Sequence, residues 1–253
     1  MLFTIWIYLY AIILVIGSIF KLQKSKKLAK QPSNEEIRKT IFETPQRVSQ
    51  KVLERTGTDV HVTGREKIPE GPVLYVANHQ GLFDILAFLG YLGKPIGFIA
   101  KKEINKLPII STWMGLLHCV FIDRQDRRQS VNAINQGIKN LKNGNSLVIF
   151  PEGTRSRGSE LHPFKPGSLR LATKANVPIV PVTIDGTYKM LEEGKGRVKG
   201  STIHMTIHHP IMPETYQELK SSDLAEKIQH IVQDGLPNNK GIIEDAEVAV
   251  ETP

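Results

Sequence analysis

The chain is poor in cysteine, which limits its chemistry before any motif is considered. Its 253 residues contain one cysteine, Cys119, so an intrachain disulfide is excluded and a reducing cytoplasm fits. Cys119 lies in an apolar stretch, where a core residue is a better interpretation than a reactive thiol. The sequence also lacks the Gly-x-Ser-x-Gly elbow of serine hydrolases. It therefore offers no recognisable nucleophile for covalent catalysis.

Formal charge is missing from residues 2–20. A helix of this length measures about 28 Å, just enough to cross a hydrocarbon core. No basic residue precedes the run, which argues against a cleaved signal peptide. Lysines follow it instead and predict that the next domain is cytoplasmic. Aromatic residues crowd its first half, as in a helix embedded in one leaflet, but we favour a helix that spans or nearly spans.

Patterns typical of nucleic-acid and metal sites are absent as well. The net charge is +8, yet basic and aromatic residues do not interleave. An anionic leaflet and a phosphorylated substrate explain this charge better than nucleic acid does. Histidines alternate within 203–209, but no cysteine or carboxylate stands at ligand spacing, so solvated strand histidines are the better interpretation. We expect no nucleic-acid partner, no metal and no cofactor.

Short apolar runs alternate with amphipathic stretches through the rest of the chain. Strands are predicted at about 59–64, 73–77, 96–100, 117–122, 146–150, 179–184 and 201–209. Helical periodicity separates them, most clearly between Arg127 and Asn143. This pattern predicts an α/β fold with a mostly parallel central sheet of about seven strands flanked by helices. An N-terminal membrane-associated helix or helical hairpin precedes it.

Residues 33–55 are predicted to form an amphipathic helix before the first strand. Ser33 and Glu36 make a capping box, and Pro45 predicts a kink or two shorter helices. Two roles are open for this segment. It is either the second arm of a membrane-docking hairpin or a helix packed on the domain that follows.

One motif supplies a base and its partner. His79 and Asp84 lie five residues apart in Asn78-His79-Gln80-Gly81-Leu82-Phe83-Asp84, directly after an apolar strand. An unbroken helix would place them on different faces, so we expect His79 at a strand end and Asp84 near a helix start. A carboxylate on the imidazole Nδ1–H fixes the tautomer and lets the ring deprotonate an alcohol. Alone, the motif also fits a loop histidine beside an N-capping aspartate.

Three further motifs end or follow apolar runs. They are Phe121-Ile122-Asp123-Arg124, Phe150-Pro151-Glu152-Gly153-Thr154-Arg155-Ser156 and Val177-Pro178-Ile179-Val180-Pro181. With these motifs in this order, the chain resembles the 1-acylglycerol-3-phosphate (lysophosphatidate) acyltransferases of the glycerolipid acyltransferase superfamily. The resemblance covers about residues 58–210.

The resemblance implies a reaction and a role for each motif. His79, oriented by Asp84, deprotonates the sn-2 hydroxyl of lysophosphatidate, which attacks an acyl thioester and gives phosphatidate without an acyl-enzyme. The donor is acyl-CoA or acyl-acyl-carrier protein. Arg155 binds the acceptor's phosphate, and Glu152 positions that arginine or contacts the glycerol.

Several further residues are expected to bind substrate. Arg124 and Lys101 are additional phosphate ligands, although a solvated charge run also explains Lys101. Arg157 falls just outside its motif, and the solvated interpretation is favoured there. Backbone N–H groups are expected to hold the oxyanion. They come from residues 79–81 or from the turn Glu152-Gly153-Thr154.

We therefore expect a membrane enzyme whose catalytic domain lies on the cytoplasmic face and contacts anionic lipid. The chain divides into an anchor with a basic stretch (1–30), an amphipathic segment (31–57), an acyltransferase domain (58–236) and a flexible acidic tail (237–253). Two alternatives stay open. One is a sister acyltransferase for glycerol 3-phosphate or another lysolipid, and the other is a non-catalytic lipid-binding membrane protein.

Overall fold

A seven-stranded sheet organises the molecule. The structure is a computed structural model that describes residues 1–123 and 125–237. The strands are β1 (Asp59–Thr63), β2 (Leu74–Ala77), β3 (Ile96–Lys101), β4 (Val120–Ile122), β5 (Ser146–Ile149), β6 (Ile179–Asp185) and β7 (Thr202–Ile207). Their order is β1-β7-β6-β2-β5-β3-β4, and only the β6–β7 pair is antiparallel within the described residues. The predicted α/β fold and mostly parallel sheet are confirmed.

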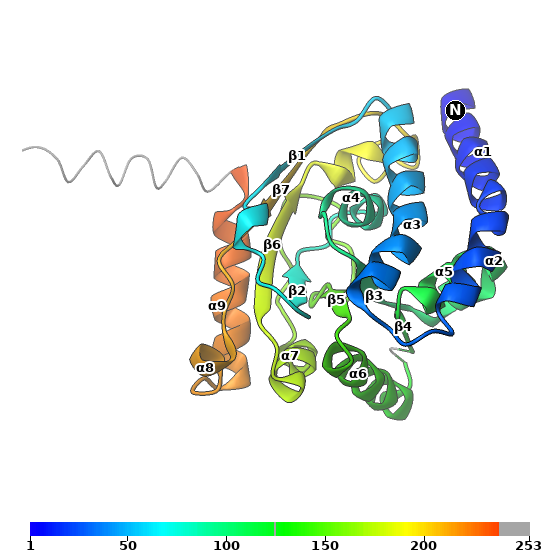
Figure 1. Cartoon of the computed structure of the whole chain (residues 1–253). Helices are drawn as coiled ribbons and strands as arrows, with labels where there is room; N and C mark the ends of the chain where they lie inside the picture. The colour runs from blue at the N-terminus through cyan, green and yellow to red at the C-terminus, as the bar shows by residue number, and fades with distance from the viewer. Residues whose placement is uncertain (124, 238–253) are drawn as a thin grey trace, which may run out of the picture.

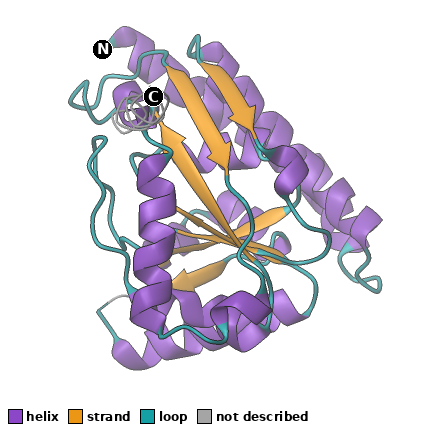
Figure 2. Ribbon diagram, turned by 90° about the vertical axis from the view of Figure 1, so that its left-hand side faces the viewer, coloured by secondary structure: helices purple, strands orange, loops and turns teal. Residues whose placement is uncertain are grey.

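Helices cover both faces of this sheet (Figures 1 and 2). One layer holds α1 (Leu2–Gly17), α2 (Ile19–Leu28), α3 (Glu35–Arg55), α4 (Asp84–Tyr91) and α5 (Pro108–Leu116). The other holds α6 (Arg127–Lys142), α7 (Arg170–Ala175), α8 (Pro213–Tyr216) and α9 (Ser221–Asp234). Successive strand residues enter opposite layers: Tyr75 packs with the first and Val76 with the second. Burial on both faces explains why β2 and β5 are apolar and why β6 is largely so, whereas β1 and β7 alternate polar and apolar residues and expose one side.

Helix α3 differs from its prediction at its start and at Pro45. Asn34 is the N-cap, and its Oδ1 accepts the Ile37 N–H at 2.8 Å. The predicted Ser33–Glu36 capping box is therefore wrong. Pro45 lies inside one continuous helix, so the alternative of two shorter helices is also wrong, and the kink stays a prediction. Packing of α3 on α4 maintains the helix despite the backbone hydrogen bond that proline removes.

Helices α1 and α2 form the outer edge of their layer, beyond α3 in Figure 1. They are bent by 44° at Ser18, whose hydroxyl donates to the Val15 carbonyl and accepts the Trp113 indole N–H. A hydroxyl bonded to the preceding turn is a recognised cause of helix bending. Within the described chain no single helix is long and apolar enough to cross a membrane, although the bent pair together meets the length and composition of a broken span or re-entrant loop.

Two predictions fall outside the described residues. Arg124 is one, and almost all of the predicted tail, residues 238–253, is the other. The division of the chain into four parts stays a prediction.

Candidate active site

The predicted site residues gather at the carboxyl edge of the sheet. Strands β2 and β5 are parallel neighbours, so the loops that follow them leave the same edge. His79 comes two residues after β2, and Glu152 three residues after β5. Asp84 begins α4. The expected strand-to-helix arrangement of the first motif is therefore confirmed, and its position is where open α/β sheets bind ligands.

His79 and Asp84 form a hydrogen-bonded dyad. Their Nδ1 and Oδ2 atoms lie 2.6 Å apart. An ionised carboxylate only accepts hydrogen bonds, so Nδ1 carries the proton and Nε2 presents a lone pair. Nε2 has no hydrogen-bond partner within the part of the chain that the structure describes. The side chain is 18% exposed, so Nε2 is available to a substrate hydroxyl.

Asp84 is fully buried and is held by three groups. Oδ2 also accepts the Gly81 N–H at 3.0 Å, and Oδ1 accepts the Thr187 hydroxyl. Thr187 opens the short 3-10 turn Thr187–Met190 after β6, far from the motif in sequence. These contacts fix the carboxylate behind the imidazole. Sequence reasoning missed Thr187 because a single threonine after a strand carries no signal.

The loop that carries His79 is fixed by buried amides. The side chain of Asn78 bonds both the N–H and the carbonyl of Ile184, each at 2.8 Å. Gln80 donates to Asp185 at 2.9 Å. The imidazole stacks on Phe150, with ring centroids 4.2 Å apart. The motif's other residues therefore set the position and plane of the ring.

Glu152 supports the His79 loop rather than Arg155. It is 3% exposed; Oε1 accepts the His79 N–H at 2.7 Å and Oε2 accepts the His162 N–H at 3.1 Å. Burial raises the pKa of this carboxyl above its usual range, against the lowering effect of the two backbone N–H groups. The expectation that Glu152 positions Arg155 is wrong. Its substrate contact stays a prediction.

Arg155 is paired with Glu192 instead. Its guanidinium donates to Oε1 of Glu192 at 2.9 Å, and the same oxygen accepts the Leu82 N–H at 2.9 Å. The Arg155 side chain is 38% exposed and that of Glu192 is 6% exposed. Glu192 lies outside all four motifs, and nothing in its local sequence distinguishes it. The structure alone identifies it as a site residue.

The turn after β5 is joined to the His79 loop. Ser156 donates its N–H to the His79 carbonyl at 2.8 Å, and Arg157 donates its N–H to the Gln80 carbonyl at 3.1 Å. Gly153 has φ +72°, which favours glycine, and a Cβ there would stand 2.7 Å from Lys165 Nζ. Thr154 beside it is exposed. This places Gly153 and Thr154 in the turn next to the dyad.

Three of the six backbone N–H groups expected to hold an oxyanion are engaged within the protein. The N–H groups of His79 and Gly81 bond Glu152 and Asp84, and that of Gly153 bonds the Phe150 carbonyl. Those of Gln80, Glu152 and Thr154 remain as candidates from the predicted set. No oxyanion role is assigned to a side chain.

Lys101 lies farther from the dyad. It ends β3 and is exposed. Its neighbour Lys102 pairs with Asp123. The structure therefore brings the His79 and Glu152 motifs together and leaves Lys101 at the next strand. Its phosphate contact stays a prediction.

Cys119 is a poor candidate for a reactive nucleophile. Its Sγ accepts the Phe98 N–H at 3.2 Å, and burial raises the pKa of the thiol to about 12. The thiolate that a nucleophile requires is therefore scarce at neutral pH. In the described residues, no group of three or more His, Cys, Asp or Glu side chains is arranged to hold a metal ion.

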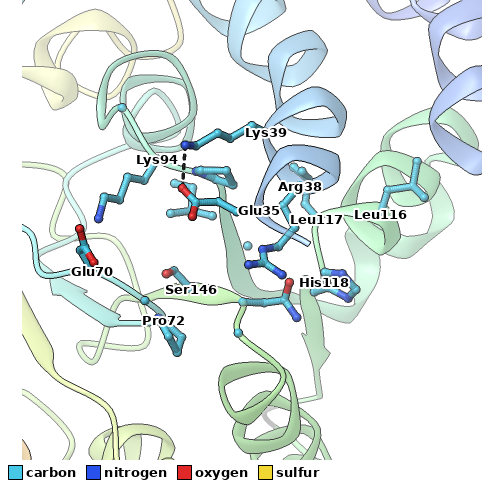
Figure 3. A pocket seen from close by; sticks show the side chains of 17 residues that line it. Glu35, Arg38, Lys39, Glu70, Pro72, Lys94, Leu116, Leu117, His118 and Ser146 are labelled. Atoms are coloured by element: carbon cyan, nitrogen blue, oxygen red, sulfur yellow. Dashed lines mark ion pairs between the residues drawn. The ribbon is translucent and has the colours of Figure 1, made fainter. Parts of the chain in front are cut away.

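Two cavities lie at opposite edges of the sheet. One, of about 360 Å³, is lined by Phe150, Pro151 and Gly153 of the third motif together with apolar residues of α6. The other, of about 470 Å³, lies near Arg38, Lys94 and His118, where the strands begin (Figure 3). None of the predicted site residues lines that second cavity. Of the two cavities, only the one at the carboxyl edge is therefore lined by a predicted site residue that the structure describes, Gly153.

Comparisons with known proteins match the part of the chain that carries the four motifs. The family model described as Acyltransferase matches residues 59–185, which contain all four motifs. The 1-acyl-sn-glycerol-3-phosphate acyltransferase of Saccharomyces cerevisiae is 35% identical over 184 residues, 71% of this chain and 60% of that protein. The probable enzyme of the same name from Mycoplasma genitalium is 35% identical over 192 residues, 71% of each chain.

A solved structure extends the similarity over the whole chain. The crystal structure of the 1-acyl-sn-glycerophosphate (LPA) acyltransferase PlsC from Thermotoga maritima superposes with a TM-score of 0.80 at 29% identity. The match covers 100% of this chain and 97% of that one. By contrast, the chain spans about three fifths of the yeast relative's length.

Proposed function

We propose that this chain, which belongs to the acyltransferase family, transfers a fatty acyl group from a thioester to the sn-2 hydroxyl of 1-acylglycerol 3-phosphate, forming phosphatidate. The observation that carries the proposal is the 2.6 Å contact between His79 Nδ1 and Asp84 Oδ2 at the carboxyl edge of the sheet. The names of the relatives at about 35% identity support the acceptor. The donor is acyl-CoA or acyl-acyl-carrier protein.

In the proposed reaction His79 is a general base acting on the substrate's own hydroxyl. Nε2 takes the hydroxyl proton as the oxygen attacks the thioester carbon, so a C–O bond forms and the carbonyl oxygen becomes an oxyanion. The intermediate then collapses, the C–S bond breaks, and the imidazolium returns its proton to the leaving thiolate. Asp84 stabilises the imidazolium, and Thr187 and Gly81 keep that carboxylate in place. No acyl-enzyme forms.

Arg155 is the proposed ligand of the acceptor's phosphate. Its guanidinium stands beside the His79 loop, tied to it through Glu192, and is partly exposed. A guanidinium has five N–H donors, and its planar fork matches phosphate oxygens. A phosphate bound here places the adjoining glycerol next to the dyad.

The proposed location is the cytoplasmic surface of a membrane, to which α1 and α2 attach the enzyme. Exposed apolar side chains cover the outer side of α1, including Leu9 at 53% and Ile13 at 65% exposure. Lysines of α2 follow, as suits anionic lipid. Buried Thr4, on the inner side of α1, accepts the Val198 N–H at 2.9 Å, which attaches this helix to the segment that carries Glu192.

An acceptor panel tests the proposal. Purified enzyme in mixed micelles is given labelled acyl-CoA or acyl-acyl-carrier protein with lysophosphatidate, glycerol 3-phosphate, lysophosphatidylcholine or monoacylglycerol. We expect phosphatidate from lysophosphatidate as the dominant product. A higher kcat/KM for any other acceptor, or no acyl transfer with either donor, would overturn the assignment.

A further inference from the structure

We infer that Glu192 is a positioning residue that sets the acceptor's phosphate at a fixed place relative to His79. The inference rests on the proposed function, because it requires a phosphorylated acceptor bound by Arg155. Glu192 lies outside residues 59–185 and outside all four motifs. The four motifs therefore do not point to it.

One oxygen of Glu192 joins the two parts of the site. Oε1 accepts the Leu82 N–H at 2.9 Å and the Arg155 guanidinium at 2.9 Å. Leu82 lies in the loop between His79 and Asp84. A single carboxylate oxygen thus connects the loop of the base to the proposed phosphate ligand. It holds the guanidinium at one distance from the imidazole.

Burial shows which partner fixes the other. The Glu192 side chain is 6% exposed, whereas that of Arg155 is 38% exposed. The buried carboxylate is the rigid member, and the arginine extends from it toward solvent. One N–H of the guanidinium is directed at Glu192, and the guanidinium carries further donors for a phosphate. A bond to a fixed carboxylate also lowers the side-chain entropy that Arg155 loses when it binds.

The second carboxylate oxygen of Glu192 shows that the Glu192–Arg155 pair differs from an ordinary surface ion pair. Oε2 is buried without a hydrogen-bond partner in the described structure. It lies against Gly81, where an added Cβ would stand 2.5 Å away. An unpaired buried oxygen costs stability. Stability alone does not explain a carboxylate at this place, whereas positioning of Arg155 does.

The test separates positioning from folding by comparing acceptor KM with kcat. Glu192→Gln keeps an oxygen for the Leu82 N–H but removes the charge that orders Arg155, and Glu192→Ala removes both. The matched control is Glu193→Gln, whose carboxylate is 48% exposed and pairs with Lys199. Each variant is assayed with lysophosphatidate at saturating donor, and again with the donor varied.

We expect Glu192→Gln to raise the KM for lysophosphatidate about tenfold or more, with kcat and donor KM near those of the wild type and of Glu193→Gln. Adding Glu192→Gln to Arg155→Ala should then change little, because both act on one contact. An unchanged acceptor KM, or equal losses for acceptor and donor, would overturn the positioning role. A wild type that does not acylate lysophosphatidate would instead overturn the proposed function.

Discussion

At the scale of single residues, the site depends on two buried carboxylates, Asp84 and Glu152. Asp84 bonds side chains and a backbone N–H, whereas Glu152, within the described residues, bonds backbone N–H groups alone. Asp84 accepts hydrogen bonds from the His79 ring, the Thr187 hydroxyl and the Gly81 backbone N–H. Glu152 receives two backbone N–H groups, yet burial still raises its pKa. Asp84 therefore orients the His79 imidazole, and Glu152 fixes the backbone of the His79 loop.

Asp84→Asn should abolish most turnover without preventing substrate binding. An amide in place of the carboxylate favours the wrong imidazole tautomer and no longer stabilises the imidazolium. We expect kcat to fall by about 10³-fold or more, as for the aspartate of a serine protease triad. Steady-state assays give kcat and acceptor KM, with thermal unfolding as the control for folding. Turnover within a few-fold of the wild type would contradict the role of Asp84.

Glu152→Gln should alter how stability depends on pH. The folded protein holds the Glu152 proton above the pH at which the unfolded chain releases it, because burial raises the folded pKa. Wild-type stability relative to Glu152→Gln should therefore decrease as pH rises from about 4.5 through the folded pKa. The slope is at most about 1.4 kcal/mol per pH unit, and the difference is constant at higher pH.

Denaturant unfolding of both proteins between about pH 4 and pH 8 measures this difference. Glu160→Gln is the control, since Glu160 is an exposed carboxylate of the same loop region. Parallel curves for wild type and Glu152→Gln would show that burial does not govern this carboxyl.

The sequence identifies the site residues that contact each other within one short segment of the chain. His79 and Asp84 share one loop, so their spacing was informative. Thr187 and Glu192 reach the same loop from 103 and 110 residues away. Such contacts depend on where β6 and the turn after it lie, which no local pattern specifies. For the same reason the three-residue spacing of Glu152 and Arg155 predicts a contact between them that the structure does not have; Arg155 pairs with Glu192.

At the scale of elements, apolar runs locate the central strands because both faces of β2, β5 and β6 are buried, and alternation of polar and apolar residues locates β1 and β7. Helix ends and breaks were harder. The bend at Ser18 involves Trp113 of α5, and the continuity of α3 through Pro45 depends on packing against α4. Both outcomes are tertiary effects that override local propensity. Asn34 and Ser33 are both good caps; the local pattern predicts Ser33, whereas the structure uses Asn34.

The cap of α3 is a direct test at this scale. Asn34→Ala removes the acceptor of the Ile37 N–H and should lower the free energy of unfolding by about 1 kcal/mol. Ser33→Ala removes only an exposed acceptor of the Arg38 guanidinium and should cost less than about 0.5 kcal/mol. Urea unfolding of the two variants measures both losses in the free energy of unfolding. The reverse ranking would restore the cap at Ser33.

At the scale of the whole molecule, the sheet separates two helical layers, and only one of them carries α1 and α2. The exposed apolar surface of α1 is the proposed membrane contact. Ile13→Glu places a charge on that surface and should weaken binding to anionic phospholipid vesicles about tenfold or more. Vesicle sedimentation measures the change.

Val131→Glu is the matched control, because Val131 is an exposed apolar residue on α6, in the opposite layer. It should bind vesicles as the wild type does. If Ile13→Glu also bound them normally, α1 would not be the membrane contact.

The most direct test of the central claim is acyl transfer to lysophosphatidate by His79→Ala. The substitution removes the imidazole but leaves the backbone N–H that bonds Glu152, so the loop is retained. With purified protein, labelled acyl thioester and lysophosphatidate, we predict that the wild type forms phosphatidate and that His79→Ala is slower by about 10³-fold or more. Phosphatidate formation by His79→Ala at the wild-type rate would contradict His79 as the general base.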